Sequence, residues 1–106
     1  MILLTCAVEE ELASWKDRSD VERLITGVGP VEAGCAIAAA LALGTYELVV
    51  NAGIAGAFDG AGQIGDGVVV AEETVELDLE NGEPIHLPRG ARPVERAHSD
   101  AALVAR

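Results

Sequence analysis

Residues 47–58, with the sequence ELVVNAGIAGAF, constrain the fold of this chain more than any other segment. Residues 48–50 are apolar and branched without polar alternation, which predicts a strand covered on both faces. Asn51, Gly53 and Gly56 then indicate a loop whose backbone can approach another group closely. Because open α/β sheets bind ligands at the carboxyl ends of strands, this is a candidate binding loop. The same pattern also fits a plain exit from strand to turn.

Composition predicts one small acidic domain spanning residues 1–106. Half of the 106 residues are hydrophobic but only 3% are aromatic, so Ala, Val, Leu and Ile must form the core. Asp plus Glu total 18 and Lys plus Arg total 7, a formal charge of −11. This charge repels nucleic acid and anionic membranes, and it argues against holding free phosphate by charge alone.

Cysteine and histidine usage points away from disulfide and metal chemistry. Cys6 and Cys35 lie in apolar runs, so we expect both to be buried free thiols in a reducing compartment. His86 and His98 are too isolated to suggest a metal site. Acidic residues follow the apolar residues 1–4 at once, which does not fit a secretory signal, and no apolar run is long enough to span a bilayer. We therefore expect a cytoplasmic protein that does not bind membranes.

Strand and helix patterns alternate along the chain. Pro30 suits the first position of a helix, and the helix after it is apolar almost all round, so we expect it to be sandwiched between other layers. The predicted strands are residues 1–6, 21–26, 46–50 and 68–71, and the predicted helices are residues 7–16 and 31–43. This order predicts an α/β fold with helices on both faces of a mostly parallel sheet.

The remaining residues predict little that would cover such a sheet. Asn81-Gly82 suggests a hairpin between residues 75–79 and 84–87, and residues 100–106 have a short helical pattern. We therefore expect the chain to be the first half of a larger domain.

Four segments in a set order carry a family resemblance. The segments are AVEEE (7–11), TGVGPVEAG (26–34), VVNAGIAGAF (49–58) and IGDGVVVAEE (64–73). Together they resemble the purine nucleoside phosphorylase and nucleosidase superfamily, and most of all futalosine hydrolase, the nucleosidase of one menaquinone pathway. The resemblance covers about residues 1–75. It implies a three-layer α/β/α fold, here truncated, a nucleoside substrate, no cofactor and a homo-oligomer.

Glu11 is the candidate catalytic residue. Hydrolysis of an N-ribosidic bond requires a water to be oriented and deprotonated as it attacks C1′, and the ribosyl cation to be stabilised by negative charge. Glu11 lies just past the carboxyl end of the first strand, and by resemblance it matches the water-activating carboxylate of the family. The alternative for Glu11, favoured for Glu9 and Glu10, is a solvated acid in the first turn of a helix.

The candidate substrate-binding residues lie after the second and third strands. Gly29 belongs to a turn that the family keeps beside the ribose, although a purely structural turn is an equal alternative. By resemblance, Asn51 and Ile54 stand where phosphorylases carry Arg and Ser for phosphate, which favours water as the nucleophile. We expect Ala55 and Gly56 to present backbone groups to the base or ribose.

The sequence leaves several alternatives open. The family's base-stacking aromatic, ribose-binding Met-Glu pair and base-protonating Asp find no match before Arg106. A methylthioadenosine or adenosylhomocysteine nucleosidase, a purine nucleoside phosphorylase relative, and an inactive nucleoside-binding or self-associating module are the alternatives. A dinucleotide-binding fragment fits less well, because Glu32 replaces the third glycine of the G-x-G-x-x-G pattern.

Overall fold

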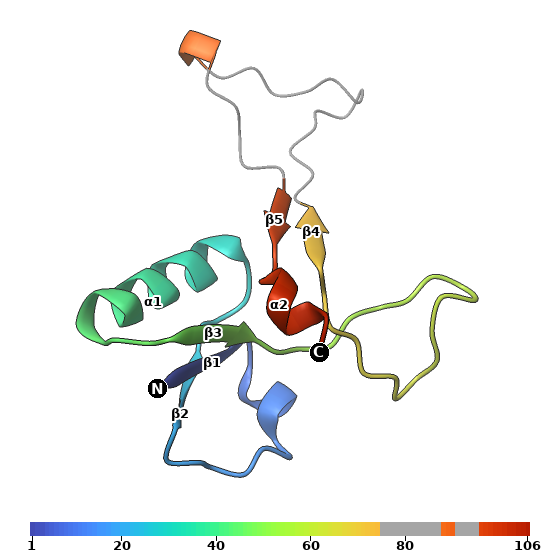
Figure 1. Cartoon of the computed structure of the whole chain (residues 1–106), viewed down its shortest axis with the longest axis horizontal. Helices are drawn as coiled ribbons and strands as arrows, with labels where there is room; N and C mark the ends of the chain where they lie inside the picture. The colour runs from blue at the N-terminus through green and yellow to red at the C-terminus, as the bar shows by residue number, and fades with distance from the viewer. Residues whose placement is uncertain (75–87, 91–95) are drawn as a thin grey trace. The chain divides into compact units, whose positions relative to one another are not determined.

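Three parallel strands form the sheet that organises the first part of the chain. The computed structural model describes residues 1–74, 88–90 and 96–106 and divides the chain into two units, Met1–Asp59 and Gly60–Arg106. In the first unit, β1 (Ile2–Cys6) lies between β2 (Val21–Ile25) and β3 (Leu48–Asn51), in the order β2-β1-β3 (Figure 1). The predicted α/β fold with a parallel central sheet is confirmed.

Both faces of the central strand β1 are buried, whereas its neighbours β2 and β3 are exposed or half-buried. Leu3 and Thr5 point to one face, and Leu4 and Cys6 point to the other. All four are at most 5% exposed. Leu4 and Cys6 pack with Leu12 of the short 3-10 helix η1 (Glu9–Leu12).

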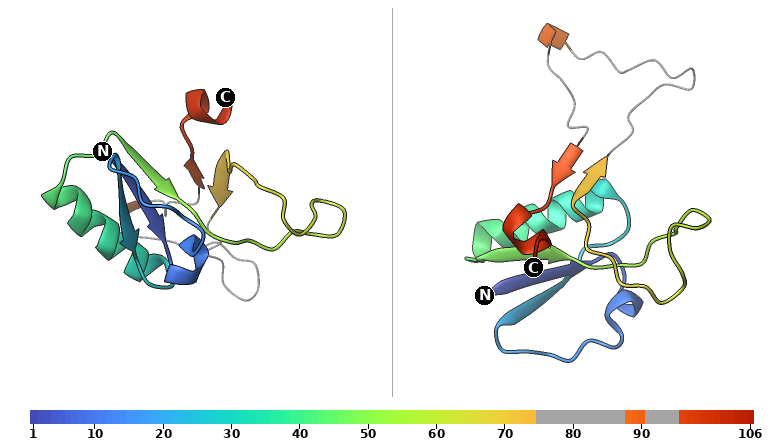
Figure 2. Two further views of the ribbon diagram at one scale, coloured as in Figure 1. Left: turned by 90° about the horizontal axis from the view of Figure 1, so that it is seen from below. Right: turned by 45° about the vertical axis from the view of Figure 1, so that its right-hand side comes forward.

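The helix α1 (Pro30–Leu43) connects β2 to β3 and runs beside the sheet (Figure 2). The connections β1 to β2 and β2 to β3 cross the sheet in opposite directions, so right-handed crossovers place η1 and α1 on opposite faces. The predicted helix and its start at Pro30 are confirmed. The expected sandwiching is not found within this unit: no α1 residue is buried, and Val31 and Leu43 are 75% and 92% exposed.

The helix predicted for residues 7–16 was wrong. The structure has only η1 there, followed by turn and irregular backbone to Asp20. A helix of fewer than about 12 residues is unstable without packing, and Leu12 is the one residue of η1 that is buried. The Glu11 side chain also bonds to backbone N–H groups ahead of η1, which favours a tight local turn.

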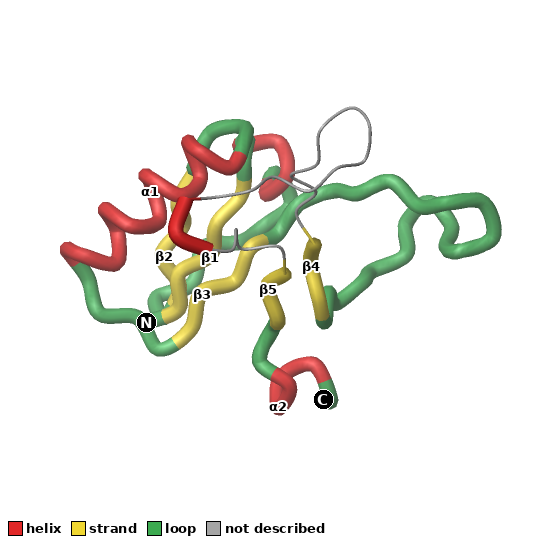
Figure 3. The backbone as a smooth tube through the Cα atoms, turned by 90° about the horizontal axis from the view of Figure 1, so that it is seen from above, coloured by secondary structure: helices red, strands yellow, loops and turns green. Residues whose placement is uncertain are grey.

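The strand predicted for residues 68–71 was also wrong. These residues are part of the long connection without helix or strand between β3 and β4 (Glu72–Thr74), shown as loop in Figure 3. Val68 and Val69 are 80% and 74% exposed, because β-branched residues favour an extended chain but do not provide a pairing partner. The predicted hairpin over residues 75–87 lies outside the described residues.

The second unit contains a two-stranded antiparallel sheet and a short helix. β4 pairs with β5 (Arg96–His98), and the Glu72 carboxylate lies 3.2 Å from the Arg96 guanidinium. A 3-10 helix, η2, spans Pro88–Gly90. The predicted C-terminal helix is confirmed as α2 (Ala101–Val104), because the Asp100 carboxylate accepts hydrogen bonds from the N–H groups of Ala102 and Leu103.

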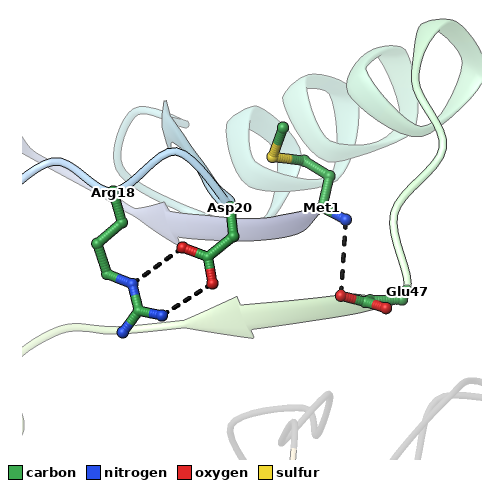
Figure 4. Close-up of polar contacts among 4 residues, drawn as sticks. All are labelled: Met1, Arg18, Asp20 and Glu47. Carbon is green, nitrogen blue, oxygen red and sulfur yellow. Dashed lines mark hydrogen bonds and ion pairs between the residues drawn. The ribbon is translucent and has the colours of Figure 1, made fainter.

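Polar contacts gather at the amino end of the sheet (Figure 4). The Arg18 guanidinium donates to both carboxylate oxygens of Asp20, at 3.0 and 2.8 Å, and the amino group of Met1 lies 3.6 Å from the Glu47 carboxylate. Exposed pairs of this kind contribute little to stability. No helix of the described residues is long and apolar enough to cross a membrane.

We predict that Leu3→Ala destabilises the protein by about 2–5 kcal/mol, because it leaves a cavity beside the central strand. Leu3 is fully buried. The control is Val28→Ala, since Val28 is 72% exposed and its truncation should change the free energy of unfolding by less than about 0.5 kcal/mol. Urea unfolding followed by circular dichroism measures both. Equal midpoints for the two variants would contradict this description of the core.

Candidate functional site

The carboxyl ends of the three parallel strands meet at one edge of the sheet. In the register, Cys6 lies opposite Ile25, and Thr5 lies opposite Asn51. The pairing continues into the loops: the N–H of Gly27 donates to the Ala7 carbonyl at 3.1 Å, and the N–H of Ala52 donates to the Thr5 carbonyl at 2.8 Å. The loops that hold all the predicted site residues therefore begin at this edge.

Glu11 connects two of these loops through its carboxylate. Its Oε2 accepts hydrogen bonds from the backbone N–H groups of Ala7 at 2.9 Å and Val8 at 3.3 Å. Its Oε1 accepts a longer bond, 3.4 Å, from the N–H of Ile54 after β3. Glu11 and Ile54, which the sequence placed in one site, are thus brought together, although their roles stay predictions.

These backbone bonds keep the carboxylate of Glu11 ionised. The N–H groups of Val8, Ala7 and Ile54 lower the pKa of Glu11, while partial desolvation opposes them. A group whose pKa is lowered by folding contributes stability above its unfolded pKa, and this contribution is lost as pH falls through the lowered value. Since a carboxylate has about four lone-pair positions and three accept backbone bonds, Oε1 keeps one position for a further donor.

Gly53 allows the Glu11 carboxylate to lie against the loop after β3. A Cβ atom built on Gly53 would lie 2.9 Å from Oε1 of Glu11, so the carboxylate would have to shift to accommodate it. Sequence reasoning recognised Gly53 as a loop glycine but did not include it in the site. The available signal was its place two residues past a buried strand.

Thr5 was not predicted from the sequence to belong to the site. Its hydroxyl is fully buried in β1 and lies 3.0 Å from Oδ1 of Asn51, to which it donates. Asn51 itself is exposed at the end of β3. A single hydroxyl residue in an otherwise apolar strand was the signal for this contact.

The other predicted binding residues are open to solvent. The Ile54 side chain is 88% exposed, and Ala55 and Gly56 are exposed as well. Gly29 precedes the first residue of α1 with φ of 99°, a conformation that favours glycine. A Cβ atom at Gly29 or Gly56 would meet nothing within 4 Å. Among the hydrogen bonds of the described residues, the one that joins this group to Glu11 comes from the backbone N–H of Ile54.

Cys6 and Cys35 differ in exposure, which corrects the expectation that both are buried. Cys6 is buried and its thiol donates to the Val8 carbonyl at 3.2 Å, whereas Cys35 is exposed on α1. Burial, reinforced by the negative charge of Glu11, raises the pKa of the Cys6 thiol and keeps it protonated. Cys6 is therefore a poor nucleophile.

The arrangement can orient and deprotonate a water or stabilise a nearby cation. An ionised carboxylate with an open lone pair lies beside the exposed backbone of the loop after β3. The described residues include no group of three His, Cys, Asp or Glu side chains that could hold a metal ion.

Comparison with known proteins identifies one family. The family model described as the phosphorylase superfamily matches residues 20–106, which include β2, α1 and β3. No curated protein and no solved structure matches the chain. The match begins after β1 and η1, so it does not include Glu11.

We predict that Gly53→Ala raises the pKa of Glu11 toward its ordinary value, because the new methyl group displaces Oε1 from the Ile54 N–H. The control is Gly56→Ala on the same loop, where a Cβ meets nothing. Titration of the Glu11 side-chain carboxyl by ¹³C NMR measures both. An unchanged pKa in Gly53→Ala would show that Ile54 does not hold this carboxylate in solution.

Proposed function

This chain belongs to the phosphorylase superfamily, and on that premise we propose that it acts as a nucleosidase, hydrolysing the bond between a ribose and its base. The superfamily includes nucleoside phosphorylases and nucleosidases, which act on the same bond with phosphate or water. We propose water as the nucleophile. We further propose that the protein works in the cytoplasm, where its two free cysteines stay reduced.

The observation that carries the proposal is the bonding of Glu11. Its carboxylate is held ionised at the carboxyl edge of the sheet, with one lone pair of Oε1 open. A water that donates to Oε1 is oriented by that bond and transfers its proton to the carboxylate as its oxygen attacks C1′. The bond from C1′ to the base breaks, and its electron pair leaves with the base, which takes a proton from water. The same negative charge stabilises the positive charge that develops on the ribose.

Two features support water over phosphate. By resemblance, Asn51 and Ile54 occupy the positions where phosphorylases carry Arg and Ser, and neither side chain can replace the guanidinium fork on phosphate oxygens. The formal charge of −11 also disfavours an anionic co-substrate.

The proposed substrate is futalosine, which would release hypoxanthine in menaquinone biosynthesis. The support is the resemblance of NAGIAGAF and IGDGVVVAEE, residues 51–58 and 64–73, to futalosine hydrolase. Substrates of methylthioadenosine nucleosidases fit less well, because those enzymes have a hydroxyl residue where Ile54 stands.

A second candidate is a nucleoside-binding module that self-associates without catalysis. The observation that favours it is the exposed apolar side of α1, with Val31 and Leu43 at 75% and 92% exposure. Nucleoside binding with no turnover, together with a stable oligomer in analytical ultracentrifugation, would favour this candidate over the nucleosidase.

We predict that the protein releases hypoxanthine from futalosine in phosphate-free buffer, and that Glu11→Gln lowers kcat by about 10²–10⁴-fold, because the amide cannot accept the proton of the water. The control is Glu10→Gln, an exposed acid in the same turn. Chromatographic detection of hypoxanthine measures the rate. Strict dependence on phosphate would exclude a hydrolase, and full activity of Glu11→Gln would remove Glu11 from the mechanism.

A further inference from the structure

Thr5 is an unusual residue for the centre of this sheet. It is fully buried, with 0% of its surface exposed. Among the described residues, Thr26 is the one other buried polar residue. The Thr26 hydroxyl bonds to backbone carbonyls of Cys6 and Gly27, as many buried hydroxyls do. The Thr5 hydroxyl instead reaches a side chain at the edge where the candidate site lies.

The hydrogen bonds of Thr5 determine how the Asn51 amide is oriented. A hydroxyl has one proton, and two acceptors compete for that of Thr5: Oδ1 of Asn51 at 3.0 Å and the Val50 carbonyl at 3.4 Å. The shorter bond is favoured. With Oδ1 held by Thr5, the Nδ2 group of Asn51 is left with two N–H donors, for which the described residues show no acceptor.

We propose that Thr5 is a positioning residue, which fixes the Asn51 amide so that Nδ2 donates to an acceptor atom of the bound nucleoside. The acceptor would be an oxygen of the ribose, because Asn51 stands by resemblance where phosphorylases hold the phosphate that attacks C1′, and a neutral amide donor suits a neutral hydroxyl. The Glu11 carboxylate, which follows β1, accepts hydrogen bonds. The carboxyl edge of the sheet therefore offers one donor and one acceptor. The nature of the ligand rests on the proposed nucleosidase function.

Substitution can distinguish a positioning role of Thr5 from a role in packing alone. Valine has nearly the same shape as threonine but lacks the hydroxyl, and it is a better residue for a buried strand. If Thr5 only filled the core, Thr5→Val would leave ligand binding unchanged. If Thr5 fixes Asn51, the Asn51 amide can rotate in Thr5→Val. Ligand binding must then order this amide, which lowers the affinity.

The experiment measures inosine binding by NMR titration in the wild-type protein, Thr5→Val, Thr5→Ser, Asn51→Ala and the double variant Thr5→Val/Asn51→Ala. We expect Thr5→Val to raise the dissociation constant about three- to tenfold, as for one hydrogen bond, and Thr5→Ser to restore it. In the Asn51→Ala background, Thr5→Val should have no further effect. The Nδ2 resonances of Asn51 should shift in Thr5→Val and stay near their wild-type positions in Thr5→Ser.

Several results would overturn the proposal. The first is a dissociation constant for inosine in Thr5→Val equal to that of the wild-type protein. The second is an equal loss of affinity from Thr5→Val in the wild-type and Asn51→Ala backgrounds. The third is no binding of inosine to the wild-type protein. The proposed nucleosidase function fails separately, if inosine binds but futalosine is not hydrolysed. If hydrolysis occurs, Thr5→Val should raise KM for futalosine and leave kcat within about twofold, because a contact made equally with the substrate and the transition state affects binding and not the chemical step.

Discussion

The structure of the first unit depends on the pairing of β1 with a parallel strand on each side. Because β1 is central, its alternate residues are buried on both faces, and the small core consists largely of this strand with Leu12. The same pairing aligns the carboxyl ends of all three strands. The candidate site is therefore a direct consequence of the register that opposes Cys6 to Ile25 and Thr5 to Asn51.

The carboxylate of Glu11 has a structural and a proposed chemical role. Its bonds to Ala7, Val8 and Ile54 hold the loops after β1 and β3 together and favour its ionised form. A lowered pKa makes a carboxylate a weaker base but a constant negative charge at neutral pH. Stabilising a developing ribosyl cation requires such a charge, and deprotonation of the water becomes easier as the oxygen bonds to C1′.

Polar groups at the edge divide into acceptor and donor. The Glu11 carboxylate accepts hydrogen bonds, and the Asn51 amide, whose Oδ1 accepts from Thr5, keeps its Nδ2 group as a donor. Neither arrangement needs a cation, which agrees with the proposed preference for water over phosphate in a chain of charge −11. Catalysis and substrate binding are thus proposed for separate residues, Glu11 in η1 and Asn51 at the end of β3.

The elements β1, β2, α1, β3 and α2 could be predicted from the sequence, because strand patterns, Pro30 and the short helical pattern of residues 100–106 are local signals. Tertiary structure decided the rest. Residues 7–16 and 68–71 had helical and strand patterns, but short segments take such structure only where packing or a pairing partner stabilises it. The contacts of Glu11 with Ile54 and Gly53, and of Thr5 with Asn51, join residues more than 40 positions apart, so only the parallel register brings them together.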